Sequence, residues 1–292
     1  MHAFSRISKF ILVGLISGFL GSVSAGPIPG EYQVGGFALG CQAYTFNRFT
    51  AFEAIEKTEA AGGKVIEFYP GQPLSPTDRN VKVGHDMSDA AIAVLQEKLT
   101  KHGIKAVNYG VVGIPNNEAG ARQIFEFAKK LGLYAVTTES TDAIDTFEPL
   151  VKEYDIRVAF HNHGRQPNNP NYKIWDPTWV RDLVKNRDPR IGACADIGHW
   201  QTSGITAVQG LKILEGRVIS MHAKERAKLG PGEHDQVFGT GATDMAGVLA
   251  ELRRQNFAGN ISIEYEFNWD HSVPDVAQCI GFVRGWNAAP KQ

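Results

Sequence analysis

Residues 191–200 read Ile-Gly-Ala-Cys-Ala-Asp-Ile-Gly-His-Trp, and this stretch decides the fold. A short apolar run suited to a β-strand ends in a carboxylate at Asp196, and His199 follows. Buried strands ordinarily end in turn-forming Gly, Asn or Ser, so ionisable side chains at a strand end indicate a polar site. Runs that end in Glu or His recur at residues 136–139, 158–163, 218–222 and 261–266. Because parallel α/β barrels place their chemistry at the C-terminal ends of the strands, this repetition predicts one shared site.

On both sides of this stretch, apolar runs suited to β-strands alternate with segments whose apolar residues repeat with the period of an α-helix. The expected strands lie at residues 37–44, 65–68, 104–109, 133–138, 156–160, 191–195, 218–222 and 261–265. Eight strand–helix pairs over about 250 residues match the size of a closed (β/α)8 barrel. An open doubly wound sheet would carry a glycine-rich phosphate turn after its first strand, whereas Gly35 and Gly36 come before it. We therefore predict an α/β protein with a single-domain (β/α)8 TIM barrel.

The overall composition narrows the class of partner. The chain has 292 residues, of which 30 are basic and 31 acidic, and it contains no long block of like charge. A nucleic-acid or anionic-membrane partner is therefore not expected, since both require a basic surface. A small-molecule partner is expected, and homo-oligomerisation is left open. Cys41 and Cys194 fall within expected strands, where buried free thiols are expected rather than a disulfide framework.

The N-terminal residues have the pattern of an export signal. Arg6 and Lys9 precede an apolar run over residues 10–20, and Val23-Ser24-Ala25 forms a small-x-small cleavage pattern. This order predicts a secretory signal peptide over residues 1–25 and a barrel domain over 26–292. The protein is accordingly expected to be exported, periplasmic or secreted, and free of the membrane after cleavage. An uncleaved anchor is the alternative, although the run is short for a span of about 20 residues.

A barrel would bring five strand-end residues together at one rim, namely Glu139, His163, Asp196, His222 and Glu264. Any one of them alone could be a turn cap or a hydrogen-bonded core residue, but the repetition at one topological place favours a site. Mixed carboxylate and imidazole ligands suit a divalent ion such as Mn²⁺, Co²⁺, Mg²⁺ or Zn²⁺. A zinc site with cysteine ligands is disfavoured because no thiol accompanies the set.

Four motifs carry a resemblance to a known family. They are Asp196-Ile197-Gly198-His199, His222-Ala223-Lys224, Phe238-Gly239-Thr240-Gly241 with Asp244, and Ile263-Glu264-Tyr265-Glu266. On these motifs, about residues 37–286 resemble the xylose-isomerase-like TIM-barrel superfamily, which includes sugar and sugar-phosphate isomerases and epimerases and inosose dehydratase. The spacing of Asp196 and His222 also fits that superfamily. The resemblance implies that Asp196, His222 and Glu264 are metal ligands and that His199 and Lys224 contact substrate.

The end of the fifth strand departs from the family pattern. Epimerases of the superfamily usually carry a glutamate there, whereas residues 161–163 read His-Asn-His, as in the inosose dehydratase branch. Glu139 is therefore expected to supply the missing carboxylate, which makes the predicted metal set Glu139, Asp196, His222 and Glu264. A histidine base opposite a metal-held carboxylate is expected in place of two catalytic carboxylates.

The expected reaction is proton abstraction next to a sugar carbonyl, with a divalent ion stabilising the enediolate. His163 or His161 would be the base, because a neutral imidazole titrates near working pH. Glu264 would be the metal-held carboxylate, and Lys224 or His199 would protonate or stabilise the leaving oxygen. Glu266 is expected to face away from Glu264 and to play a supporting part. The expected substrate-binding residues are His199, Trp200, Lys224 and Glu67.

The sequence leaves the outcome of this chemistry open. A metal-dependent isomerase or epimerase is the leading prediction. A lyase or dehydratase that acts by β-elimination on 3-keto-sugars or 3-keto-glycosides is the alternative. An exported carbohydrate-binding barrel without catalysis is an alternative of another class, and it need not hold a stoichiometric metal ion. A DNA-repair endonuclease is disfavoured by the signal peptide and by the neutral overall charge.

Overall fold

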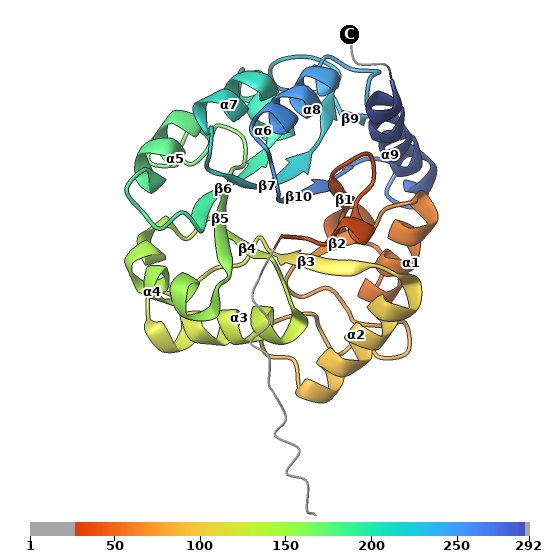
Figure 1. Ribbon diagram of the computed structural model, residues 1–292, viewed down its shortest axis with the longest axis vertical. Coiled ribbons are helices and arrows are strands. Elements are labelled where there is room, and N and C mark those ends of the chain that lie inside the picture. The colour runs from red at the N-terminus through yellow and green to blue at the C-terminus, as the bar shows by residue number, and fades with distance from the viewer. Residues whose placement is uncertain (1–26, 290–292) are drawn as a thin grey trace, which may run out of the picture.

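The computed structural model describes residues 27–289, so the predicted signal peptide lies outside the described residues. Eight parallel strands close into a barrel with helices around it (Figure 1), which confirms the predicted single-domain (β/α)8 fold. The barrel strands are β1 (Ala38–Gln42), β2 (Val65–Phe68), β3 (Lys105–Tyr109), β4 (Ala135–Thr138), β5 (Arg157–His161), β6 (Ile191–Asp196), β7 (Val218–Ala223) and β10 (Asn260–Ile263). Around the barrel, β10 pairs with both β7 and β1 and so closes the sheet.

The larger helices follow the strands and cover the outside of the barrel. They are α1 (Ala51–Ala61), α2 (Asp89–His102), α3 (Glu118–Leu131), α4 (Ile144–Tyr154), α5 (Pro177–Val184), α7 (Ala207–Ile213), α8 (Met245–Arg254) and α9 (Val273–Ala288). Local sequence sets their ends. Thr50 and Glu53 form a reciprocal capping box at the start of α1, and Gly62, at φ 90°, ends it in the left-handed conformation. Among residues 27–289, no helix has the length and apolarity of a membrane span.

Apolar residues close one end of the barrel and polar residues gather at the other. Ile28 packs with Ala38, Val65 and Ala135, which lie at the first positions of β1, β2 and β4. Toward the C-terminal ends of the strands, by contrast, the buried residues are polar or ionisable, including Gln42, Glu67, Asn108, His161, Asp196 and His222. A site is therefore built at the C-terminal end, where each strand passes into its loop.

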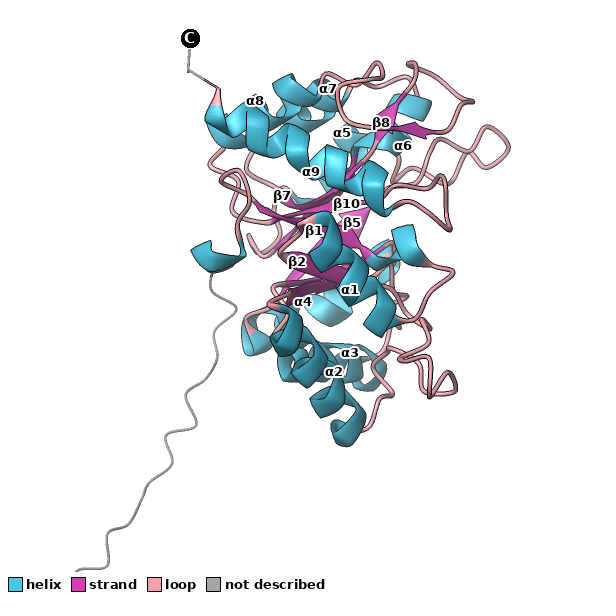
Figure 2. Cartoon of the chain, turned by 90° about the vertical axis from the view of Figure 1, so that its right-hand side faces the viewer, coloured by secondary structure: helices cyan, strands magenta, loops and turns pink. Residues whose placement is uncertain are grey.

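Two features of the loops were not predicted. A short helix, α6 (Ile197–Thr202), begins directly after β6. The Asp196 side chain caps this helix by accepting a hydrogen bond from the backbone N–H of His199. The loop after β7 contains a small hairpin of β8 (Glu225–Arg226) and β9 (Asp235–Gln236), and Figure 2 shows β8 apart from the barrel strands, among the loops. The buried Glu225 carboxylate accepts hydrogen bonds from the backbone N–H groups of Gly239 and Thr243, and these bonds hold the long loop against the barrel.

Candidate metal centre and active-site cavity

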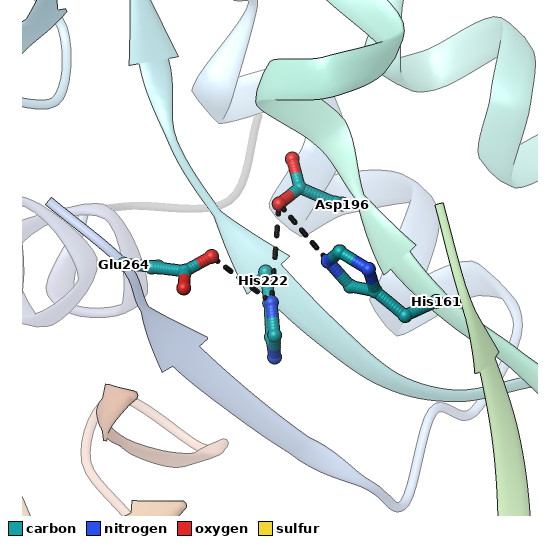
Figure 3. Close-up of side chains that lie close together, drawn as sticks. All are labelled: His161, Asp196, His222 and Glu264. Carbon is teal, nitrogen blue, oxygen red and sulfur yellow. Dashed lines mark ion pairs between the residues drawn. The ribbon is translucent and has the colours of Figure 1, made fainter. Parts of the chain in front are cut away.

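Four ionisable side chains meet at the C-terminal ends of neighbouring strands (Figure 3). His161 ends β5, Asp196 ends β6, His222 lies in β7, and Glu264 follows β10. Asp196 and His222 are register partners, and β5, β6, β7 and β10 are consecutive around the barrel. One potential ligand atom from each of the four lies within 4.8 Å of those of the others. The topology thus assembles a four-residue cluster from positions far apart in the sequence.

Three of the facing atoms of this cluster are buried and make no hydrogen bond to any described residue. Asp196 Oδ2 lies 3.5 Å from His161 Nε2 and 3.8 Å from His222 Nδ1, and His222 Nδ1 lies 3.1 Å from Glu264 Oε2. Within the described part of the chain, His161 Nε2, Asp196 Oδ2 and His222 Nδ1 have no hydrogen-bond partner. A buried polar atom without a partner costs about 1–3 kcal/mol. A divalent cation would satisfy all of them at once, so the donor set fits a metal ion with imidazole and carboxylate ligands.

Glu139, which the sequence placed among the ligands, lies outside this cluster. Its Oε1 accepts a hydrogen bond from His161 Nδ1 at 3.0 Å and another from His163 Nδ1, and the Tyr172 hydroxyl donates to Oε2 at 3.1 Å. The strand order explains this, because β5 lies between β4 and β6 and so places His161 between Glu139 and Asp196. Glu139, His161 and His163 also lie within 4.8 Å of one another, but hydrogen bonds already join their facing atoms.

These hydrogen bonds set the charge of the Glu139–His163 pair. Burial alone would raise the pKa of Glu139, but the hydrogen bonds from His161 and His163 lower it to about 2. The hydrogen bond to Glu139 raises the pKa of His163 above its ordinary value. The carboxylate therefore stays ionised and orients His163 by its Nδ1 atom.

Lys224 carries a buried ammonium group among three carboxylates. Its Nζ lies 3.2 Å from Asp196 Oδ2, 2.9 Å from Glu264 Oε2 and 2.5 Å from Glu266 Oε1. Burial alone would lower the pKa of Lys224, but Asp196 and Glu264 raise it well above its ordinary value. Gly198 makes this position possible, because a Cβ there would lie 2.5 Å from Cβ of Lys224. The lysine thus offsets the negative charge of the cluster.

A cavity of about 390 Å³ opens beside the cluster. It is lined by Gln42, Tyr44, Tyr69, Pro70, Gly110, Val111, His161, His163, His199, Glu264 and Glu266. The histidines and glutamates come from the β5, β6 and β10 ends, and the aromatic residues come from the β1 and β2 ends. Tyr44 makes edge-to-face contacts with Tyr69 and Trp269, at ring-centroid distances of 5.3 Å and 6.0 Å. Sequence reasoning missed the two tyrosines, although both follow strands at this same rim.

The expected substrate-binding residues divide between the cavity and the core. His199 lines the cavity, with Nε2 3.8 Å from Asp196 Oδ2, and burial lowers its pKa to about 3. Trp200, one residue further around α6, is buried against Gly210 and does not line the cavity. Glu67 is fully buried beneath the cluster, with Oε1 3.0 Å from His222 Nε2, and it does not line the cavity.

Glu266 lines the cavity beside Glu264, so the expectation that it faces away from Glu264 was wrong. β10 ends at Ile263, and the backbone N–H of Tyr265 bonds to the Thr45 hydroxyl instead of continuing the sheet. Residues two apart in an extended chain share a face, so Glu264 and Glu266 both line the cavity, while Tyr265 between them is buried. The strand period of two could have indicated this from the sequence.

Comparisons with known proteins agree with this architecture. Residues 55–282 match the family described as xylose isomerase-like TIM barrel. The comparison with curated proteins gave no match. An uncharacterised protein from Parabacteroides distasonis is 31% identical with a TM-score of 0.67, over 85% of this chain and 98% of that one.

Two further solved structures share the fold at lower identity. A D-tagatose 3-epimerase-like protein is 16% identical with a TM-score of 0.65, over 85% of this chain and 96% of that one. A D-allulose 3-epimerase from Methylomonas sp. is 14% identical with a TM-score of 0.63, over 85% of this chain and 97% of that one. The family match covers most of the chain and agrees with its closed barrel, and the chain therefore belongs to the xylose isomerase-like TIM barrel family.

Proposed function

We propose that the protein is a divalent-metal-dependent sugar isomerase or epimerase that removes a proton next to a carbonyl group. The observation that carries the proposal is the cluster of His161, Asp196, His222 and Glu264, which lies beside a cavity. Three of its facing atoms are buried and make no hydrogen bond among the residues that the structure describes. The cavity volume of about 390 Å³ falls within the range of small-molecule sites. Epimerases among the structures that share the fold support a sugar as the substrate.

A divalent ion held by these four residues would polarise a sugar carbonyl and stabilise the charge that develops when the neighbouring proton leaves, an effect of several kcal/mol. We assign the residues that hold the ion as His161, Asp196, His222 and Glu264, with His161 in place of Glu139. The buried site keeps the carboxylates ionised, because Lys224 and His222 hold the pKa of Glu264 well below its ordinary value despite its burial.

His163 is the proposed base. Its side chain is 53% exposed and lines the cavity, while its Nδ1 is hydrogen-bonded to Glu139. Because the carboxylate accepts a hydrogen bond from Nδ1–H, Nε2 of the neutral ring is left to take a proton from substrate. Positioned general bases contribute roughly 10²–10⁴-fold to rate. Glu139 acts through His163, as a carboxylate that orients the imidazole.

Glu266 and Lys224 form a second group that can carry protons. Their side chains are hydrogen-bonded to each other. Glu266 lines the cavity after β10, and β7 and β6 separate β10 from the β5 strand that leads to His163. A proton could therefore be removed at His163 and returned from the Glu266 side, as epimerisation requires. The aromatic residues Tyr44 and Tyr69 would pack against the apolar face of the sugar ring.

The same hydrogen-bonded pair favours a second candidate function. A proton donor held at the cavity by a buried lysine suits expulsion of a β-substituent, because the departing oxygen must be protonated. His163 would remove the proton next to the carbonyl, and the Lys224–Glu266 pair would protonate the leaving oxygen. A lyase or dehydratase that acts on 3-keto-sugars or 3-keto-glycosides is therefore the alternative. The N-terminal pattern supports the further proposal that either reaction occurs outside the cytoplasm on unphosphorylated sugars.

Hydrogen–deuterium exchange tests both candidates. The protein loaded with Mn²⁺ or Co²⁺ would be incubated in D₂O with ketoses, aldoses and 3-keto-glycosides, and label and products would be followed by NMR. Label in a recovered epimer or isomer supports the leading proposal, whereas an unsaturated product or a released aglycone supports elimination. Sugar binding without exchange or product from any member of the panel would refute both, and would favour a non-catalytic carbohydrate-binding barrel.

A further inference from the structure

Both imidazoles of the four-residue cluster contact a carboxylate outside the cluster. His161 Nδ1 lies 3.0 Å from Glu139 Oε1, and His222 Nε2 lies 3.0 Å from Glu67 Oε1. The remaining ring nitrogens, His161 Nε2 and His222 Nδ1, face Asp196 Oδ2. The two rings therefore use opposite nitrogens toward the cluster, yet each has a carboxylate behind it.

A carboxylate behind the ring determines which nitrogen carries the proton. An ionised carboxylate only accepts hydrogen bonds, so the ring nitrogen that contacts it must be the N–H. The other nitrogen of a neutral imidazole then presents its lone pair, which is the form that binds a metal ion. Glu139 thus selects the Nδ1–H form of His161, and Glu67 selects the Nε2–H form of His222.

We propose that Glu67 and Glu139 are positioning residues that fix the tautomers of His222 and His161 and thereby set the metal affinity of the cluster. This inference rests on the proposed function, since it concerns the same metal centre. The sequence indicated substrate binding for Glu67 and metal ligation for Glu139. The inference replaces both roles with the positioning of a histidine ligand. Neither side chain needs to contact substrate or ion.

The surroundings of Glu67 show that its carboxylate is held in place from below the cluster. Ser262 Oγ donates to Glu67 Oε2 at 2.8 Å, and Asn260 Nδ2 donates to Ser262 Oγ at 2.8 Å. Glu67 is on β2, Ser262 on β10 and His222 on β7, so the network crosses the barrel interior. Glu67 is 0% exposed, and burial of a carboxylate is costly unless hydrogen bonds compensate for it. Its oxygens accept hydrogen bonds from Ser262 Oγ and His222 Nε2, which orients the ring of His222.

The experiment measures Co²⁺ binding to the full barrel by calorimetry and by visible absorption, independently of any sugar. Glu67→Gln keeps the size of the side chain but removes the charge and adds an N–H group that can favour the wrong tautomer. Its dissociation constant for Co²⁺ is expected to rise about 10–100-fold, with an altered absorption spectrum. Ser262→Ala, which only frees Glu67 Oε2, is expected to weaken binding less. Glu56→Gln, at an exposed carboxylate on α1, is the matched control and should bind as the wild type does.

Nitrogen-15 NMR of labelled histidine reads the tautomers directly in the metal-free protein, at a pH above the pKa of His222, where its ring is neutral. The expected result is an Nε2–H signal for His222 in the wild type and a mixture of tautomers in Glu67→Gln. An unchanged dissociation constant and spectrum in folded Glu67→Gln and Ser262→Ala would overturn the inference. If Glu67→Gln does not fold, Ser262→Ala alone decides the result, because weaker Co²⁺ binding supports the inference and wild-type affinity overturns it. Weaker binding in the variants, combined with no reaction of any sugar, would leave the inference standing and overturn only the proposed function.

Discussion

Lys224→Met provides the most direct test of the charge balance in the cluster. The substitution keeps the length of the side chain but removes the ammonium group that lies within 3.2 Å of oxygens of Asp196, Glu264 and Glu266. Lys224 is 3% exposed and Asp196 is fully buried, so water cannot take over the role of the cation. The variant is therefore expected to be less stable than the wild type when metal is absent.

The magnitude follows from the burial of these groups. Removing one partner of a buried ion pair typically costs about 3–5 kcal/mol, because the remaining charge is left uncompensated. At roughly 2–4 °C per kcal/mol for a domain of this size, the Tm of the metal-free variant should fall by about 6–20 °C. A divalent ion bound to Asp196 and Glu264 would supply the missing positive charge. Saturating metal should therefore raise the Tm of the variant by more than it raises that of the wild type.

The assay is thermal unfolding followed by circular dichroism, with chelator and with excess Mn²⁺ or Co²⁺. Lys130→Met is the matched control, because Lys130 pairs with Asp89 on the surface, where both side chains are at least half exposed. Exposed pairs contribute about 0–1 kcal/mol, so this control should unfold within a few degrees of the wild type. A metal-free Lys224→Met protein as stable as the wild type would refute the assigned charge balance. An equal gain from metal in both proteins would refute the shared use of Asp196 and Glu264.

Three further predictions test other parts of the site. His163→Gln should reduce exchange of the substrate proton by roughly 10²–10⁴-fold while leaving the Co²⁺ dissociation constant unchanged. A parallel loss of Co²⁺ binding in titrations would contradict the assignment of His163 as the base. Gly198→Ala should destabilise the protein in urea by about 1–3 kcal/mol, because the added Cβ would lie 2.5 Å from Cβ of Lys224. Gly281→Ala, where nothing lies within 4 Å, is the control, and equal effects of the two changes would contradict this account. Metal affinity should fall as the pH is lowered, because Nδ1 of His222 must lose a proton before it binds an ion. Burial alone would lower the pKa of His222, but Cys194, Glu67 and Glu264 hold it well above its ordinary value. Calorimetry at neutral and acidic pH measures this, and an affinity independent of pH would exclude His222 as a ligand.

Local sequence carried the information on the fold and on much of the cluster. Strand-like runs, helix caps and glycine stops are short-range features, so the eight strand–helix repeats could be read directly from the chain. Asp196, His222 and Glu264 could be selected because each is an ionisable residue at the end of an apolar run, and the C-terminal ends of barrel strands share one rim. The barrel confirms the reasoning about topology and brings these three residues together.

The remaining assignments depended on which side chains stand next to each other, and only the tertiary structure decided that. His161 joins the cluster and Glu139 does not, because β5 lies between β4 and β6. Glu67 lies beneath His222 because β2 and β7 face each other across the barrel interior, a contact between residues 155 positions apart. Sequence patterns specify the end of a strand and the face of a residue, but neighbours across a barrel are fixed by strand order, register and the point where each strand stops.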